Sequence, residues 1–267
     1  MDVLQAFILG AIQGLTEFFP ISSSGHLKLF EHLLGLKNLD NLLFFDLICH
    51  LGTLLSIFFV YSNDIAEIFK KRDRAFFYML IVSLLPLLPI AFFEKSVRNI
   101  FGKSEYLCIF FFCTAVLLFI TSSLEKFTNS YESMPLKKRL KHAFFIGFFQ
   151  SLAIFPGISR SGSTITAARI LGWPYQDALK YSFLLAIPTI CGGTIFEVIK
   201  ITNNPSVLYA VSINCYFIGF FASFLIGLLS LKSLINLVSK GRLRFFSLYC
   251  FLLALYTFYH FNLSNTV

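Results

Sequence analysis

A polar, helix-breaking segment interrupts an otherwise apolar N-terminal region, and it reads Gln13-Gly14-Leu15-Thr16-Glu17-Phe18-Phe19-Pro20-Ile21-Ser22-Ser23-Ser24-Gly25-His26. Gln13 and Glu17 are four residues apart, so they share one face of a helix. Pro20 ends that helix, because proline is not tolerated in a helix interior, and the serines after it are favoured N-cap residues. The segment therefore predicts two short helices joined at a polar break.

A second segment repeats this pattern 137 residues later, with its own break at Pro156-Gly157-Ile158-Ser159-Arg160-Ser161-Gly162. The segments 3–35 and 142–172 align without gaps. The identities between them include Gly10 with Gly147, Gln13 with Gln150, Leu15 with Leu152, Ser22 with Ser159, Ser24 with Ser161, Gly25 with Gly162, and Gly35 with Gly172. Each half of a segment is too short to cross about 30 Å of hydrocarbon. Each segment therefore predicts a re-entrant helical hairpin, and the alignment predicts an internal duplication.

The rest of the chain is apolar enough to cross a membrane several times. Of its 267 residues, 57% are hydrophobic and 13% are charged, against about 25% charged in an average soluble domain. Six segments are long enough to span a bilayer: 41–62, 76–94, 106–124, 177–199, 208–231 and 245–262. The composition predicts an all-α integral membrane protein of one domain, residues 1–267, with six transmembrane helices and two re-entrant hairpins.

The two repeats are expected to have opposite orientations in the membrane. Each repeat, about 1–137 and about 138–267, is one hairpin followed by three spans. A hairpin enters and leaves the membrane on the same side, whereas three spans carry the chain to the other side. The second copy therefore starts from the opposite side of the membrane. This is an inverted-topology repeat, and broken helices at matching positions of two such halves point to a binding site. The two hairpins are expected to meet near the middle of the membrane.

The net charge of +8 arises from basic residues in short loops between spans, which excludes nucleic acid as a partner and makes the lipid bilayer the expected one. The loops after spans one, three and five contain thirteen basic residues: Lys70, Lys71, Arg72, Arg74, Lys126, Lys137, Lys138, Arg139, Lys141, Lys232, Lys240, Arg242 and Arg244. The loops after spans two and four contain four: Lys95, Arg98, Lys103 and Lys200. Because cytoplasmic loops are enriched in Lys and Arg, the thirteen are expected in the cytoplasm and the first hairpin opens outward.

Three ionisable side chains are expected at membrane depth beside the breaks, namely Glu17, His26 and Arg160. Such groups are costly in a membrane and usually functional. The start of a helix attracts phosphate through its free N–H groups and its dipole, and arginine holds phosphate oxygens bidentately. Asp46 and His50, one turn apart in the first span, are weaker candidates for the same site. His32, His142 and Arg169 lie near predicted helix ends, where we expect them to be solvated or to snorkel.

These motifs resemble those of the bacterial undecaprenyl-diphosphate phosphatases, the bacitracin-resistance family. Residues 13–26 match its (Glu/Gln)-x-x-x-Glu and P-x-S-x-x-G-H signature, with Gln13 as one of the two residues allowed there. Residues 156–164 resemble its P-G-x-S-R-S-G-x-T motif, and residues 46–54 resemble a third, looser motif. The resemblance runs nearly end to end and implies six spans with two hairpins, a divalent cation (Mg²⁺ or Ca²⁺), and a site at the outer face of the bacterial cytoplasmic membrane.

The implied activity is hydrolysis of undecaprenyl diphosphate to undecaprenyl phosphate, which recycles the lipid carrier for peptidoglycan synthesis and confers bacitracin resistance. Glu17, His26, Ser23 and Arg160 are the expected catalytic residues, and Glu17, supported by Gln13, is expected to bind the metal. The substrate is a polyprenyl diphosphate lipid. The residues expected to bind it are Gln13, Ser22, Ser24, Gly25, Ser159, Ser161 and Gly162.

The attacking group stays open at the level of sequence. It is Ser23 with His26 as general base, His26 itself, or a water activated by Glu17 and His26. Direct participation of His26 is preferred over Ser23, because an imidazole is already reactive near neutral pH whereas serine must first lose a proton.

A transporter or flippase is the alternative of a different class, because inverted repeats with broken helices are also typical of secondary transporters. A base beside a serine favours the enzyme. The assembly state, including a homodimer, stays open.

Overall fold

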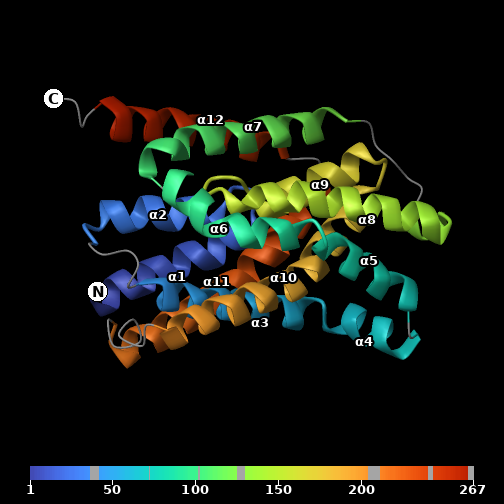
Figure 1. Cartoon of the computed structure of the whole chain (residues 1–267), viewed down its shortest axis with the longest axis horizontal. Helices are drawn as coiled ribbons and strands as arrows, with labels where there is room; N and C mark the ends of the chain where they lie inside the picture. The colour runs from blue at the N-terminus through green and yellow to red at the C-terminus, as the bar shows by residue number, and fades with distance from the viewer. Residues whose placement is uncertain are drawn as a thin grey trace.

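The computed structural model describes the whole chain apart from residues 37–41, 72, 102, 125–129, 204–210, 240–242 and 264–267. Within the described residues all regular secondary structure is helical, which confirms the predicted all-α class (Figure 1). The α-helices are α1 (Val3–Phe18), α2 (Ser23–Leu33), α3 (Leu43–Val60), α4 (Ser62–Lys71), α5 (Arg74–Leu84), α6 (Leu87–Phe101), α7 (Leu107–Ser123), α8 (Leu136–Ser151), α9 (Arg160–Ile170), α10 (Tyr175–Asn203), α11 (Ile213–Ser239) and α12 (Leu243–Phe258).

Both predicted breaks are present, and the same capping interaction closes each of them. α1 ends before Pro20 and α2 begins after Ser22, whose Oγ accepts a hydrogen bond from the Gly25 N–H at 3.4 Å. α8 is followed by a short 3₁₀ turn, and α9 begins after Ser159, whose Oγ accepts from the Gly162 N–H at 3.0 Å. The two caps lie 137 residues apart, as the alignment of the segments predicts.

Five helices are long and apolar enough to cross a membrane: Leu43–Val60, Ser104–Ser123, Tyr175–Ile199, Ile213–Leu237 and Leu243–Leu263. They coincide with five of the six predicted spans, although residues 41 and 208–210 of those predictions lie outside the described part of the chain. A sixth arises only if α4 and the helix after it count as one bent span. The chain therefore has five to six candidate spans.

The predicted continuous span over 76–94 is interrupted in the structure. α5 ends at Leu84 and α6 begins at Leu87, with a turn between them that contains Pro86. Proline has no N–H to donate and its ring clashes with the preceding turn, so the helix stops there. A count of apolar residues does not register this interruption.

The first helix of each hairpin packs closely against a helix from the other half of the chain. α1 lies against α11 and α8 lies against α5, while α7 and α12 run side by side along one edge of the molecule (Figure 1). A Cβ on Gly10 would lie 2.6 Å from the carbonyl oxygen of Gly219, and one on Gly147 would collide with the carbonyl of Ser83. The aligned glycines therefore allow equivalent close approaches in the two halves.

One prediction about solvated end residues is wrong for Arg169 and His142. Arg169 is fully buried, its Nη1 donates to the Trp173 carbonyl at 2.6 Å, and its guanidinium lies 3.9 Å over the ring of Tyr175. His142 is buried and accepts a hydrogen bond from Trp173 Nε1 at 2.9 Å. An aromatic cluster covers both side chains, and nothing in the local sequence pattern indicates this cover.

Candidate active site

The two breaks lie against each other, which confirms the prediction that the hairpins meet. The Gly157 N–H of the second break donates to Ser22 Oγ of the first at 3.1 Å. A Cβ on Gly25 would lie 2.9 Å from the Cα of Gly157, so only glycine permits this approach. Ser22 has a left-handed backbone with φ of 70°, a costly conformation for a residue other than glycine that is often found at functional sites.

A buried ion pair joins the two hairpins at this contact. Arg160 Nη2 donates to Glu17 Oε1, and only 4% of the Glu17 side chain and 17% of the Arg160 side chain are exposed. Taking these charges out of water is expensive, and the cost is offset only when the pair is well hydrogen-bonded. Arg160 Nη1 is buried, and among the described residues no group accepts a hydrogen bond from it. The guanidinium therefore still has a donor to offer to an anion.

Three further side chains lie close to the second carboxylate oxygen of Glu17, Oε2. Ser23 Oγ donates to Glu17 Oε2 at 2.6 Å, and Gln13 Nε2 donates to the same oxygen at 2.9 Å. Gln13 Nε2 also lies 2.8 Å from His50 Nδ1, which is 3.5 Å from Glu17 Oε2. His50, a weaker candidate in the sequence, therefore belongs to this cluster.

His26 is not hydrogen-bonded to Ser23, the pairing on which one of the three schemes for the attacking group depends. Its Nδ1 lies 2.7 Å from the carbonyl oxygen of Ser22 and its Nε2 lies 2.8 Å from the Tyr249 hydroxyl. A carbonyl only accepts, so Nδ1 carries the hydrogen and Nε2 accepts from Tyr249. Both nitrogens of this buried imidazole are used, and Ser23 has Glu17 as its acceptor instead. The hydrogen bond to the Ser22 carbonyl sets the orientation of the ring.

The remaining predicted substrate-binding residues hold the breaks together. Ser22 and Ser159 are N-caps, and Ser161 Oγ lies 3.2 Å from Ser159 Oγ. Gly162 allows close packing against Ser159, and the side chain of Ser24 is exposed. Contact of these residues with substrate stays a prediction.

Gln13 and Glu17 fit a divalent cation that substrate helps to bind. Among the described residues there is no cluster of three or more His, Cys, Asp or Glu that would hold a metal by itself. Gln13 Oε1, however, is buried and has no hydrogen-bond partner within the described structure. It is a hard oxygen beside a carboxylate, and Mg²⁺ typically binds one or two carboxylates together with phosphate oxygens and water. The chemistry of this donor set matches such a cation.

Sequence reasoning missed two residues that support the site. Thr114 Oγ1 donates to the Gly157 carbonyl at 2.7 Å and accepts from the Ser159 N–H at 3.0 Å, which fixes the second break. Tyr249 reaches His26 from α12. Both residues stand in apolar spans and outside any motif, so no local signal distinguishes them from the other residues of those spans.

The fold and the site together define a multi-pass helical membrane protein. Its buried centre lies between two broken helices and contains an arginine with one unused hydrogen-bond donor. The chain belongs to the family described as Bacitracin resistance protein BacA, whose family model matches residues 6–256. That match covers both breaks and all the residues of the site described above.

Proteins named undecaprenyl-diphosphatase are similar over almost the full chain. The one from Protochlamydia amoebophila is 40% identical over 98% of this chain and 100% of its own. Those from Carboxydothermus hydrogenoformans and Methanococcus vannielii are each 35% identical, over 95% and 96% of this chain and 95% and 100% of their own.

Proposed function

We propose that this chain hydrolyses undecaprenyl diphosphate to undecaprenyl phosphate and inorganic phosphate. The observation that carries the proposal is the cluster of Glu17, Ser23 and Arg160, in which a serine hydroxyl is bonded to a carboxylate beside an arginine with a free donor. The names of the relatives and the family membership support the same reaction. Recycling of the carrier lipid for peptidoglycan synthesis, and bacitracin resistance, would follow from this activity.

The diphosphate would bind where the two hairpins meet. Arg160 is the first residue of α9 and Ser23 is the first residue of α2, so two helix N-termini start at this contact. Helix N-termini and guanidinium groups both favour phosphate oxygens. Gln13 and Glu17 would hold a divalent cation, Mg²⁺ or Ca²⁺, which when bound supplies positive charge against the diphosphate.

Ser23 is the nucleophile that the hydrogen bonds favour. Its Oγ forms a bond to the terminal phosphorus, the bond from that phosphorus to the bridging oxygen breaks, and undecaprenyl phosphate leaves. Glu17 Oε2, 2.6 Å from the hydroxyl, takes the serine proton. Water then attacks the phosphorus of the phosphoserine, the bond from phosphorus to Ser23 Oγ breaks, and Glu17 returns its proton to that oxygen. Phosphate, which keeps the protons of the water, is released, and both Ser23 and the Glu17 carboxylate are restored. Arg160 stabilises the charge on the transferred phosphoryl oxygens.

His26 becomes a positioning residue in this scheme, which reverses the earlier preference for its direct participation. Both of its ring nitrogens are occupied, so neither one is free to attack phosphorus or to take a proton from Ser23. Its bond to the Ser22 carbonyl supports the left-handed residue that directly precedes the nucleophile. The imidazole therefore helps to keep Ser23 aimed at Glu17.

The proposal includes an inverted six-plus-two topology with the site open to the outer face of the bacterial cytoplasmic membrane. The paired breaks and the equivalent glycine contacts of α1 and α8 support it. In the thirteen-to-four charge comparison, Arg72, Lys126, Lys240 and Arg242 lie outside the described residues. On a cysteine-free background, Lys138→Cys should resist a membrane-impermeant thiol reagent in intact cells, whereas Lys103→Cys should label. The reverse pattern would place the site on the cytoplasmic side.

The central experiment is phosphate release from a long-chain prenyl diphosphate by purified protein in detergent with Mg²⁺ or Ca²⁺. We expect turnover that requires the cation, and loss of turnover in Glu17→Gln. A protein that binds the lipid and moves it across vesicles without releasing phosphate would be a flippase, and that result would contradict the proposal.

A further inference from the structure

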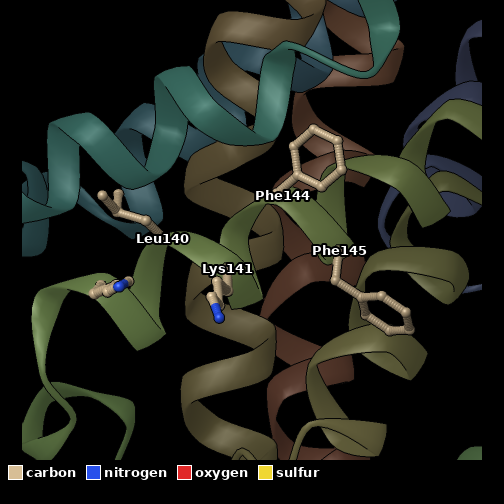
Figure 2. Close-up of a pocket in the computed structure, with 5 residues that line it drawn as sticks. Leu140, Lys141, Phe144 and Phe145 are labelled. Carbon is tan, nitrogen blue, oxygen red and sulfur yellow. The ribbon is translucent and has the colours of Figure 1, made fainter.

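A hollow of about 490 Å³ lies on the outer surface of α8, away from the catalytic cluster. Five residues of this one helix line it: Lys137, Leu140, Lys141, Phe144 and Phe145. Figure 2 shows Leu140, Lys141, Phe144 and Phe145 along this helix. The two lysines come from its start, and the two phenylalanines come from the turns that follow. The hollow therefore has a polar end and an apolar end along the helix axis.

The same polarity runs along the exposed face of α8. Lys137 and Lys141 are exposed at the start of the helix, and Phe144 and Phe148 are 52% and 53% exposed further along. The spacings of four, three and four residues place all four side chains on one helix face. A helix that presents cations at its start and aromatic rings two turns later matches the boundary between lipid headgroups and acyl chains.

The basic residues do not serve to stabilise the helix. The first turn of α8 contains Lys137, Lys138 and Arg139 and no acidic residue, although the positive end of the helix dipole disfavours cations there. Within the described residues no carboxylate forms an ion pair with Lys137 or Lys141. The positive charge at this hollow is therefore balanced by nothing in the described part of the protein, and an external anion would complement it.

We infer that the α8 hollow, lined by Lys137, Leu140, Lys141, Phe144 and Phe145, binds an anionic phospholipid. The two ammonium groups would bind the headgroup phosphate, and the aromatic rings would contact the upper part of an acyl chain. Basic pockets beside transmembrane helices on the cytoplasmic side are typical sites for anionic headgroups. The inference uses the proposed cytoplasmic placement of this loop but does not depend on the hydrolytic activity.

A second hollow without lysines serves as a comparison for the role of Lys137 and Lys141 in the first. It measures about 350 Å³ and lies between α3 and α11, where Phe44, Ile48, Ile213, Tyr216, Phe217, Phe220 and Phe221 line it. Among the described residues that line this hollow none is charged, so it would accept an acyl or prenyl chain without regard to the headgroup. The α8 hollow differs because its two lysines give a reason to prefer an anionic lipid.

Native mass spectrometry of the purified full-length protein, titrated with phosphatidylglycerol or with phosphatidylcholine of the same chains, tests the inference. We expect phosphatidylglycerol to bind roughly tenfold or more tightly than phosphatidylcholine, since each lysine near a lipid surface contributes about 1 kcal/mol. The Lys137→Gln/Lys141→Gln variant should lose that preference. Phe144→Ala, at an exposed position, should weaken binding of both lipids.

The matched control is Lys232→Gln/Arg244→Gln, which removes two exposed basic residues from the same expected side of the membrane. It lowers the net charge by the same amount but leaves the α8 hollow intact, so the lipid preference should persist. An equal loss in this control would reduce the effect to diffuse surface charge and overturn the inference. Equal binding of the two lipids by the unmodified protein would overturn it as well. No diphosphate substrate is present, so the outcome is separate from that of the phosphatase assay.

Discussion

The first hairpin, α1 with α2, and the second, α8 with α9, share the same order of helix, break and serine-capped helix. They differ in the reactive side chains beside the break. In both, a serine caps the second helix, through Ser22 to Gly25 and through Ser159 to Gly162. At the same shift of 137 residues the reactive positions diverge: Glu17 aligns with Ile154, Ser23 with Arg160, and His26 with Ser163.

This difference explains how two segments with the same pattern of breaks and caps form an asymmetric site. A carboxylate on both hairpins would place two negative charges together at membrane depth, which is strongly unfavourable. Here one hairpin provides the carboxylate and the hydroxyl, and the other provides the cation that pairs with the carboxylate. The serine caps are common to both hairpins, Ser22 also joins the two breaks through the Gly157 N–H, and the divergent residues give this contact its chemistry.

The largest expected effect comes from removing the hydroxyl that only the first hairpin has at this position. Ser23→Ala should lower kcat by about 10⁴-fold or more, because the attacking group is lost and residues acting as a unit lose rate together. Phosphate release at saturating substrate measures this, with Ser123→Ala, at an exposed serine at the end of α7 and outside the site, as the matched control near normal activity. Turnover of Ser23→Ala within tenfold of the unmodified enzyme, or an acid-labile phosphohistidine trapped on His26, would restore the histidine scheme.

The next largest effect is expected at Arg160, which the second hairpin has at the position of Ser23. Arg160→Lys keeps the charge but loses the planar fork, so kcat should fall about 10²-fold while the protein still inserts in the membrane. Arg160→Ala should be more severe, because it leaves Glu17 as an unpaired buried charge. Thermal unfolding in detergent separates the two causes of loss. Near-normal turnover of the lysine variant would show that bidentate contact is not needed.

The equivalence of the two hairpin backbones can be tested at their aligned glycines. Gly10→Ala and Gly147→Ala should each lower the stability by about 1–3 kcal/mol, because the new Cβ would meet a backbone carbonyl of the facing helix. Gly193→Ala is the control, since no described atom lies within 4 Å of a Cβ built there. It should be neutral or stabilising, as alanine is favoured over glycine in helices. Similar midpoints for all three variants in detergent unfolding would contradict the packing of the hairpins.

The smallest effect on kcat is expected at the hydrogen bond between Tyr249 of α12 and His26 of the first hairpin. The second hairpin has Ser163 at the position of His26. Tyr249→Phe removes one hydrogen bond to His26, of about 0.5–1.5 kcal/mol, so kcat should fall by about two- to tenfold. Without the hydroxyl, only the Ser22 carbonyl holds the imidazole ring, so the loss should appear in kcat while KM stays close to its normal value. Tyr256→Phe, on the same helix, should leave kcat unchanged. An unchanged kcat in Tyr249→Phe would remove the positioning role of His26.

Several features were predictable because they depend on local chemistry. Pro20 and the capping serines determine where the first hairpin breaks, since a helix cannot continue through proline and needs a cap to restart. Glu17 and Arg160 were identifiable because a charge in an apolar segment is costly unless it has a function. The repeat itself fixed which two segments would meet.

Only the tertiary structure decided how these residues are paired. Ser23 lies three residues from His26 and six from Glu17, yet it bonds to Glu17, because α1 and α2 fold back on each other at the break. Tyr249, from the far end of the chain, occupies the nitrogen of His26 that a general base would need. The burial of Arg169 under Tyr175 and Trp173 has the same origin. The sequence determines the chemical character and the local conformation of each residue. Which distant residues become hydrogen-bond partners depends on how the helices pack, and a single sequence contains no pattern that predicts this.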